Sequence, residues 1–310
     1  AGPGSCGGGG ISVPPESPRL TSLKDALTWF AFPDASVQTS RHILRLHWYV
    51  SCRLVIEGGF HPDRIRPRPP IAVKRRRDGL LLLHDPEVAK SGERTILGGL
   101  KTKRLDVTVT IPTIGPVLAV SLKGTHNAFR NLTNRMEEAA GDCTNLHMAY
   151  PALVYGFWHV LRANEADDPA PTAHFQLRDG RYVMHDLAIL GGGELTEPIQ
   201  RYHHALERLS DRDDLRDHPS RYEACGLTLV KSRGGPVECG VYPDHPLPGS
   251  VLDYNRMFRR LYAIYDRRFV YNAPALRSRT EREVWDRESP LLTEMISRDE
   301  GFAEMEPRMG

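Results

Sequence analysis

The chain has 310 residues, 40% hydrophobic and 26% charged, with a formal net charge of +2. This composition is typical of a soluble globular protein. No apolar run is long enough to span a bilayer, and no signal peptide pattern opens the chain, so we expect no membrane partner. Five widely spaced cysteines fit neither a disulfide framework nor a zinc motif, which favours a reducing, cytoplasmic setting.

The N-terminal part is predicted to be helical and basic. Residues 1–20 are rich in Gly, Pro and Ser and are expected to be loose. Apolar residues recur at helical spacing over 21–32, and this predicted helix ends before Pro33. The same spacing recurs over 41–60, where Gly58-Gly59 end the pattern. A proline-broken basic connector follows, and the apolar run 78–85 is compatible with either a strand or a helix. We treat 21–90 as one helical and basic region.

The centre of the chain predicts an antiparallel hairpin. Residues 105–111 (LDVTVTI) alternate with period two, and residues 114–124 (IGPVLAVSLKG) form a continuous β-branched run. Pro112 and Gly115-Pro116 separate the two runs. The two segments are therefore expected to pair as neighbouring strands.

The rest of the pattern predicts an α/β fold. A helix is expected over 126–140, with Met136 at the centre of its apolar stripe and Gly141 as its end. Next come a buried strand within 150–163 and a hairpin around Asp179-Gly180. The remaining segments predict a helix over 201–210, a strand over 225–232 and a helix over 253–271. This order favours a central mixed β-sheet flanked by helices in a core of residues 91–275, followed by an acidic tail over 276–310.

Two charged residues stand in the predicted hairpin where apolar residues are expected. Asp106 opens the first strand and Lys123 closes the second, so both side chains should reach the same end of the sheet. A carboxylate can hold Mg²⁺, and a lysine can orient a water and offset charge on a phosphate. One aspartate makes a poor Mg²⁺ site, so a second carboxylate is required. The plain alternative is an ion pair at the sheet edge, which contributes little to stability.

This arrangement resembles the PD-(D/E)XK nuclease superfamily, in which an Asp starts one strand and a (D/E)-x-K triplet lies on the next. Here the triplet is Ser121-Leu122-Lys123, which lacks the acid, and Leu105 stands where the motif has Pro. A subgroup of type II restriction endonucleases (NgoMIV-like and EcoRII-like) places the missing carboxylate on the following helix. The sequence offers Glu137 and Glu138 at that place.

Helical geometry distinguishes the two glutamates. At about 100° per residue from Met136, Glu137 falls on the flank of the buried stripe, with Arg130 on the same side, and Glu138 points away. Glu137 is therefore the expected ligand. Glu93, on the stretch leading into Asp106, is the alternative acid.

The resemblance implies a Mg²⁺-dependent DNA endonuclease with a restriction-endonuclease-like fold, acting on double-stranded DNA as a homodimer. It implies Asp106 and Glu137 as metal ligands, Lys123 as the residue that assists the nucleophile, and Ser121 as a supporting catalytic group. The alternative function is a non-catalytic nucleic-acid-binding protein on the same fold.

Basic residues are clustered in the first third of the chain, as expected for a face that binds a polyanion. Phosphate contacts are expected from the run at 75–77 and from the residues just before Asp106, where they would position the nucleic acid without reading its sequence. The equally simple interpretation is a solvated basic loop. The expected contacts are Arg75, Arg76, Arg77, Lys101, Lys103, Arg104 and Arg130.

Overall fold

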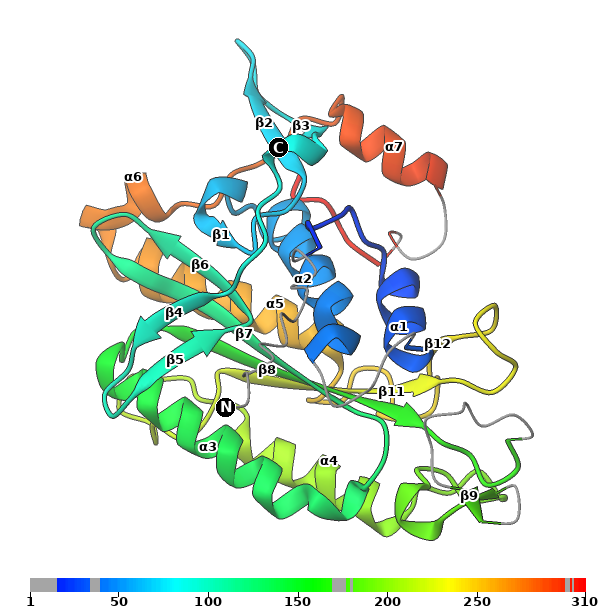
Figure 1. Ribbon diagram of the computed structural model, residues 1–310. Helices are drawn as coiled ribbons and strands as arrows, with labels where there is room; N and C mark the ends of the chain where they lie inside the picture. Colours follow the sequence, from blue (N-terminus) through cyan, green and yellow to red (C-terminus); the bar gives the residue numbers. More distant parts are fainter. Residues whose placement is uncertain (1–15, 34–39, 169–176, 179–180, 299–301, 303) are drawn as a thin grey trace, which may run out of the picture.

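A six-stranded mixed sheet forms the centre of the molecule (Figure 1). The computed structural model describes residues 16–33, 40–168, 177–178, 181–298, 302 and 304–310. The strand order is β1-β6-β7-β8-β11-β12; β7, β8 and β11 are parallel, and the other neighbours are antiparallel. The strands are β1 (Ile65–Arg66), β6 (Val107–Ile111), β7 (Gly115–Thr125), β8 (Val154–Ala163), β11 (Ala224–Lys231) and β12 (Gly240–Val241).

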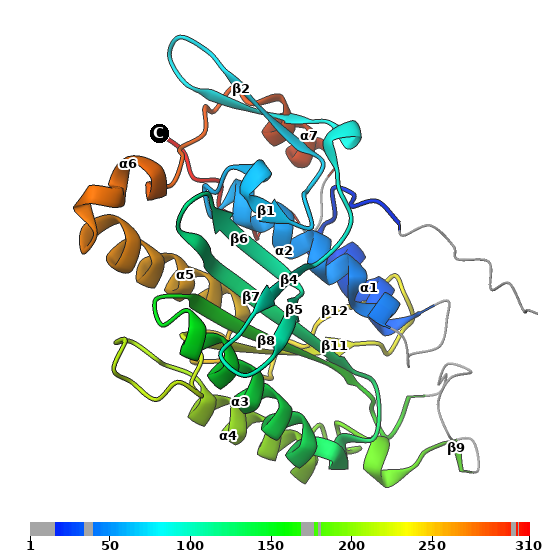
Figure 2. The ribbon, with the colours of Figure 1, turned by 60° about the vertical axis from the view of Figure 1, so that its left-hand side comes forward.

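Helices cover both faces of this sheet (Figure 2). Two of them, α3 and α4, connect the parallel strands β7, β8 and β11 and lie together on one face, because successive right-handed crossovers in one direction fall on the same side. The others cover the opposite face. The helices are α1 (Leu23–Ala31), α2 (Leu44–Ile56), α3 (Leu132–Ala149), α4 (Glu197–Leu209) and α5 (Tyr254–Tyr265), which continues as the π-helix η6 (Asp266–Tyr271).

The hydrophobic core is divided by the sheet into two clusters, and strand β7 contributes to both. Its side chains alternate between the faces: Leu118, Val120 and Leu122 pack with α1, α2 and α5, whereas Ala119 packs with α3 and α4. Ser121 and Lys123 have the same parity as Ala119. The hydrophilic residues of β7 therefore belong to the face covered by α3.

Within the described ranges, three small hairpins lie outside the central sheet, and one of them is fastened to α3. Asn145 accepts hydrogen bonds from the amides of Leu100 and Lys101 and donates one to the carbonyl of Lys101, which holds the turn between β4 and β5 on the helix. The hairpins are β2 (Ile71–Arg75) with β3 (Leu80–His84), β4 (Arg94–Leu97) with β5 (Thr102–Leu105), and β9 (Leu177–Arg178) with β10 (Arg181–Tyr182).

Much of the predicted order is confirmed. The α/β class, the 105–124 hairpin, both N-terminal helices and the buried strand β8 are present, and the ambiguous run 78–85 is a strand. The residues Asp179-Gly180 lie outside the described part of the chain, as do most of 1–20. The prediction that Gly141 ends the central helix is wrong: α3 runs through Gly141 to Ala149.

The C-terminal segment is packed against the body of the protein. Trp285 is 1% exposed, and its indole N–H donates to the carbonyls of Val55 and Ile56 in α2. Residues from 21–90, 91–275 and 276–310 thus share one hydrophobic cluster. No helix among the described residues is long and apolar enough to cross a membrane. The last helices are α6 (Arg277–Thr280) and α7 (Pro290–Arg298).

Candidate functional site

Asp106 lies at the bend between β5 and β6, and hydrogen bonds from the neighbouring strand β7 hold its carboxylate. The pairing of Val107 with Val120 places Asp106 opposite Ser121. Ser121 Oγ donates to Asp106 Oδ2 at 3.0 Å, and the amide of Leu122 donates to the same oxygen at 2.7 Å. Among the described residues no hydrogen bond reaches Asp106 Oδ1. The hairpin therefore fixes the carboxylate and leaves one oxygen open.

Lys123 lies two residues beyond Ser121 on the same face of β7. Its Nζ is 3.1 Å from Oε1 of Glu138, and the two side chains are 28% and 48% exposed. An ammonium has three donors, so this pair leaves donors of Lys123 available to a bound substrate. The hairpin thus brings Asp106, Ser121 and Lys123 to one end of one sheet face.

The glutamate of α3 that contacts Lys123 is Glu138, which the helical projection turned away from the sheet. Glu138 contacts Lys123, while Glu137 is exposed and forms no ion pair within the described part of the chain. The buried stripe runs through Leu132, Ala139, Cys143 and Leu146 and is centred about 50° from Met136.

That displacement explains the error in the helical projection. Around the observed stripe, Glu138 lies about 110° from the centre and Glu137 about 150° from it. The projection counted Met136 and Ala140 in the stripe, but both are only partly buried, so its apparent centre lay too close to Glu137. The prediction that Glu138 points away from the sheet is therefore wrong, and among the described residues Glu137 makes no contact that would support it as a metal ligand.

Two further residues approach Asp106 from other elements. One ligand atom each of His47, Glu93 and Asp106 lies within 4.8 Å of the others. His47 comes from α2 and is 1% exposed; Glu93 directly precedes β4, and its Oε1 is 3.7 Å from His47 Nδ1. The guanidinium of Arg104 pairs with the other oxygen of Glu93. We call His47, Glu93 and Asp106 the triad.

The triad has the composition of a cation site. Two carboxylates and one imidazole converge, and two ligand atoms bound to one ion at about 2.1 Å lie roughly 3–4 Å apart. A spacing of at most 4.8 Å is therefore within a small side-chain adjustment of a coordinating geometry. The residues fit a divalent cation, and Glu93, the alternative acid of the sequence, supplies the second carboxylate beside Asp106.

The basic residues just before Asp106 are largely engaged with acids. Lys103 forms an ion pair with the buried Asp142, and Lys101 Nζ lies 3.6 Å from the same carboxylate. Arg104 is bound to Glu93. Their charges are thus locally compensated, which weakens the case for these three residues as the main phosphate contacts.

The other predicted phosphate contacts are exposed. Arg75, Arg76 and Arg77 occupy the tip of the β2–β3 hairpin, which projects from the body of the protein (Figure 1). Arg76 pairs with Glu288 across the surface at 3.0 Å. Arg130 is exposed just before α3. None of these four arginines belongs to the triad.

A basic pocket lies along the outer strands of the sheet. It has a volume of about 490 Å³, and Arg64, Arg66, Arg94, His61 and Thr110 are among its lining residues. Arg94 directly follows Glu93 of the triad, and Thr110 lies four residues along β6 from Asp106. The pocket and the triad therefore share the strand β6, at a separation of about 13 Å along it.

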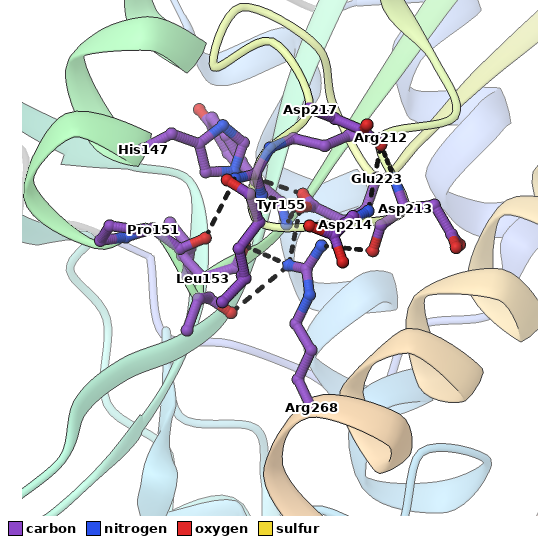
Figure 3. Close-up of polar contacts among 12 residues, drawn as sticks. His147, Pro151, Leu153, Tyr155, Arg212, Asp213, Asp214, Asp217, Glu223 and Arg268 are labelled. Atoms are coloured by element: carbon purple, nitrogen blue, oxygen red, sulfur yellow. Dashed lines mark hydrogen bonds and ion pairs between the residues drawn. The ribbon is translucent and has the colours of Figure 1, made fainter. Parts of the chain in front are cut away.

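A second polar cluster is buried around Glu223 (Figure 3). Glu223, with 0% exposure, pairs with Arg212 at 2.6 Å and Arg268 at 2.7 Å, and it accepts a hydrogen bond from the amide of Tyr155. Burial alone raises the pKa of Glu223, but hydrogen bonds and charges from His147, Arg268 and Tyr155 outweigh burial and lower it. This cluster joins β8, β11 and η6, and its enclosure marks it as structural.

The sequence did not single out His47. It lies in the predicted helix 41–60 between the buried residues Leu46 and Trp48. A histidine within such an apolar segment is a weak signal, because most buried histidines are bound by backbone or hydroxyl groups. Its importance depends on the approach of Glu93, which follows 46 residues later in the chain.

Comparison of the chain with protein-family models found no match, and comparisons with curated proteins and with solved structures found no significant match either.

Proposed function

We propose that the protein is a divalent-cation-dependent endonuclease that hydrolyses phosphodiester bonds of double-stranded DNA, with Mg²⁺ as the cation expected from the PD-(D/E)XK resemblance. The observation that carries the proposal is the connection across the β6–β7 hairpin. Asp106 is bonded to Ser121 and Leu122, and Lys123 follows on the same strand. An acid and a lysine on adjacent strands are the arrangement that the PD-(D/E)XK resemblance implies, and the acid can hold the ion that polarises a phosphoryl group.

Each residue has a defined task in this proposal. Asp106 holds the cation through its open oxygen, while Ser121 fixes the other oxygen by donating a hydrogen bond. Lys123 orients the attacking water and offsets charge that develops on the phosphoryl oxygens. A bound divalent cation would polarise the phosphoryl group and favour ionisation of the water.

The substrate is proposed from charge and geometry. The pocket with Arg64, Arg66 and Arg94 lies along the same strand as Asp106, at a distance that corresponds to about four phosphates along the axis of a DNA strand. The exposed arginines at the β2–β3 tip offer a second contact. Cutting both strands of a duplex requires two such sites, which a homodimer would supply.

The test is plasmid and oligonucleotide cleavage with Mg²⁺ or Mn²⁺ by the wild-type protein and by Asp106→Asn. The substitution retains the shape of the side chain but removes its charge, and we expect cleavage to fall by at least about 100-fold, since one charge-stabilising group contributes roughly that much to a rate. Glu137→Gln is the matched control, because Glu137 is exposed and outside the triad, and it should cleave like wild type.

Two outcomes would contradict the proposal. Cleavage that survives in Asp106→Asn would show that another site performs the hydrolysis. DNA binding without cleavage, across several duplex sequences and both cations, would favour the alternative of a non-catalytic nucleic-acid-binding protein.

A further inference from the structure

The geometry of the triad points to a first-row transition-metal ion, with Mn²⁺ as the probe, in preference to Mg²⁺. We infer that His47, Glu93 and Asp106 are the protein ligands of this ion. The inference concerns the metal of the proposed nuclease site, and it rests on that function for its catalytic consequence only. The binding itself can be measured without nucleic acid.

The inference depends mainly on the burial of His47 and on the lack of hydrogen-bond partners for its ring nitrogens among the described residues. The residue is 1% exposed, and neither ring nitrogen has a hydrogen-bond partner among the described residues. A buried polar group without a partner costs about 1–3 kcal/mol, so such groups are rare in folded proteins. Coordination of one imidazole nitrogen to a cation beside Glu93 and Asp106 removes that cost for that nitrogen.

The two carboxylates are already oriented for such an ion. Glu93 uses one oxygen for Arg104 and turns Oε1 toward His47. Asp106 uses Oδ2 for Ser121 and Leu122, which leaves Oδ1 open. Each acid thus has one oxygen bound by the protein and one without a hydrogen bond among the described residues, and one ligand atom of each acid lies within 4.8 Å of the other two ligand atoms.

The ligand set decides the class of ion. Mg²⁺ prefers oxygen ligands, whereas an imidazole ligand favours first-row transition ions over Mg²⁺. Arg104 also compensates one of the two negative charges, which weakens the purely electrostatic attraction on which Mg²⁺ depends. With three protein ligands, an octahedral ion retains three positions for water or phosphate oxygens.

Isothermal titration of the metal-free full-length protein tests this inference. Wild type should bind one Mn²⁺ at least about tenfold more tightly than Mg²⁺. His47→Gln should weaken Mn²⁺ binding by about 10- to 100-fold and leave Mg²⁺ binding nearly unchanged, so that the preference disappears. Glu93→Gln should weaken both ions, while Glu137→Gln, the matched control on α3, should alter neither.

A spectroscopic measurement on the wild-type protein tests the same inference without depending on whether a variant folds. Electron spin echo modulation of the Mn²⁺-loaded protein should show coupling to a directly bound imidazole nitrogen. Equal affinity of wild type for Mn²⁺ and Mg²⁺, or the absence of nitrogen coupling, would overturn the inference. A protein that binds Mn²⁺ through His47 but cleaves no DNA would sustain the metal site and refute the proposed function.

Discussion

His159 is a buried residue whose charge state is set by its surroundings. It has 0% exposure and lies beside Lys123 in the strand register, and its Nε2 is 3.0 Å from Thr125 Oγ1. Burial, reinforced by the charges of Arg135 and Lys123, lowers the pKa of His159 to about 3. The folded state therefore holds a neutral imidazole at neutral pH, packed against the ring of Tyr202.

This depressed pKa predicts a specific loss of stability in acid. The unfolded chain takes up a proton below its ordinary pKa of about 6.5 while the folded chain does not, so stability present above pH 6.5 is lost as pH falls toward 3. Between pH 6.5 and pH 4 the loss from this group is about 3 kcal/mol. Urea unfolding of wild type and His159→Gln should show it, and an identical pH dependence in both would contradict the assignment.

Glu223, unlike His159, stabilises the folded protein in its charged form, so we expect a loss of stability when its charge is removed. Removing its charge leaves Arg212 and Arg268 buried without their carboxylate, so Glu223→Gln should cost about 3–5 kcal/mol at neutral pH. Because the pKa of Glu223 is lowered, its contribution is present above the ordinary glutamate pKa of 4.5 and is lost as pH falls through the lowered value. Denaturant unfolding measures this change, and a cost below about 1 kcal/mol would refute the role.

Among the secondary-structure elements, the 105–124 hairpin could be predicted from the sequence, but the face that α3 buries could not. Alternation in 105–111 and the β-branched run in 114–124 are local patterns, and the turn residues lie between them, so the sequence contained the information. The phase of α3 depends on its whole length to Ala149, including polar residues such as Asn145 that are buried only because a hairpin packs on them.

Asn145 makes the position of the β4–β5 hairpin testable. Asn145→Ala removes the acceptor for two amides and the donor to Lys101, which should destabilise the protein by about 2 kcal/mol and loosen the turn at 98–101. Hydrogen exchange should report faster exchange of the Leu100 and Lys101 amides. Because Glu93 leads into β4, Mn²⁺ affinity should also fall; unchanged exchange would show that the turn is held by other contacts.

At the scale of the whole molecule, the triad is assembled by the fold. His47, Glu93 and Asp106 come from α2, the approach to β4 and the bend before β6, and one ligand atom of each lies within 4.8 Å of the others. Asp106, Ser121 and Lys123 were predictable because strand pairing aligns them locally. His47 was not, because its approach to Asp106 is determined by packing between distant segments.

The C-terminal segment is predicted to be necessary for this assembly. Trp285→Phe retains most of the aromatic volume and removes the hydrogen bonds to α2, whereas Trp285→Ala leaves a cavity beside the helix that carries His47. We expect costs of about 1 and 3–5 kcal/mol, respectively, by thermal or denaturant unfolding. Equal and small effects would show that residues 276–310 contribute little to the core.

The central claim is that Lys123 and Asp106 form one hydrolytic site, and the most direct measurement is the single-turnover cleavage rate of Lys123→Met. Lys123 pairs only with the exposed Glu138 among the described acids, so the substitution should leave folding nearly unchanged, and DNA affinity in Ca²⁺ is measured beside the rate to separate binding from hydrolysis. We expect the rate with Mn²⁺ to fall by at least about 100-fold. A rate equal to that of wild type, with DNA bound equally well, would contradict it.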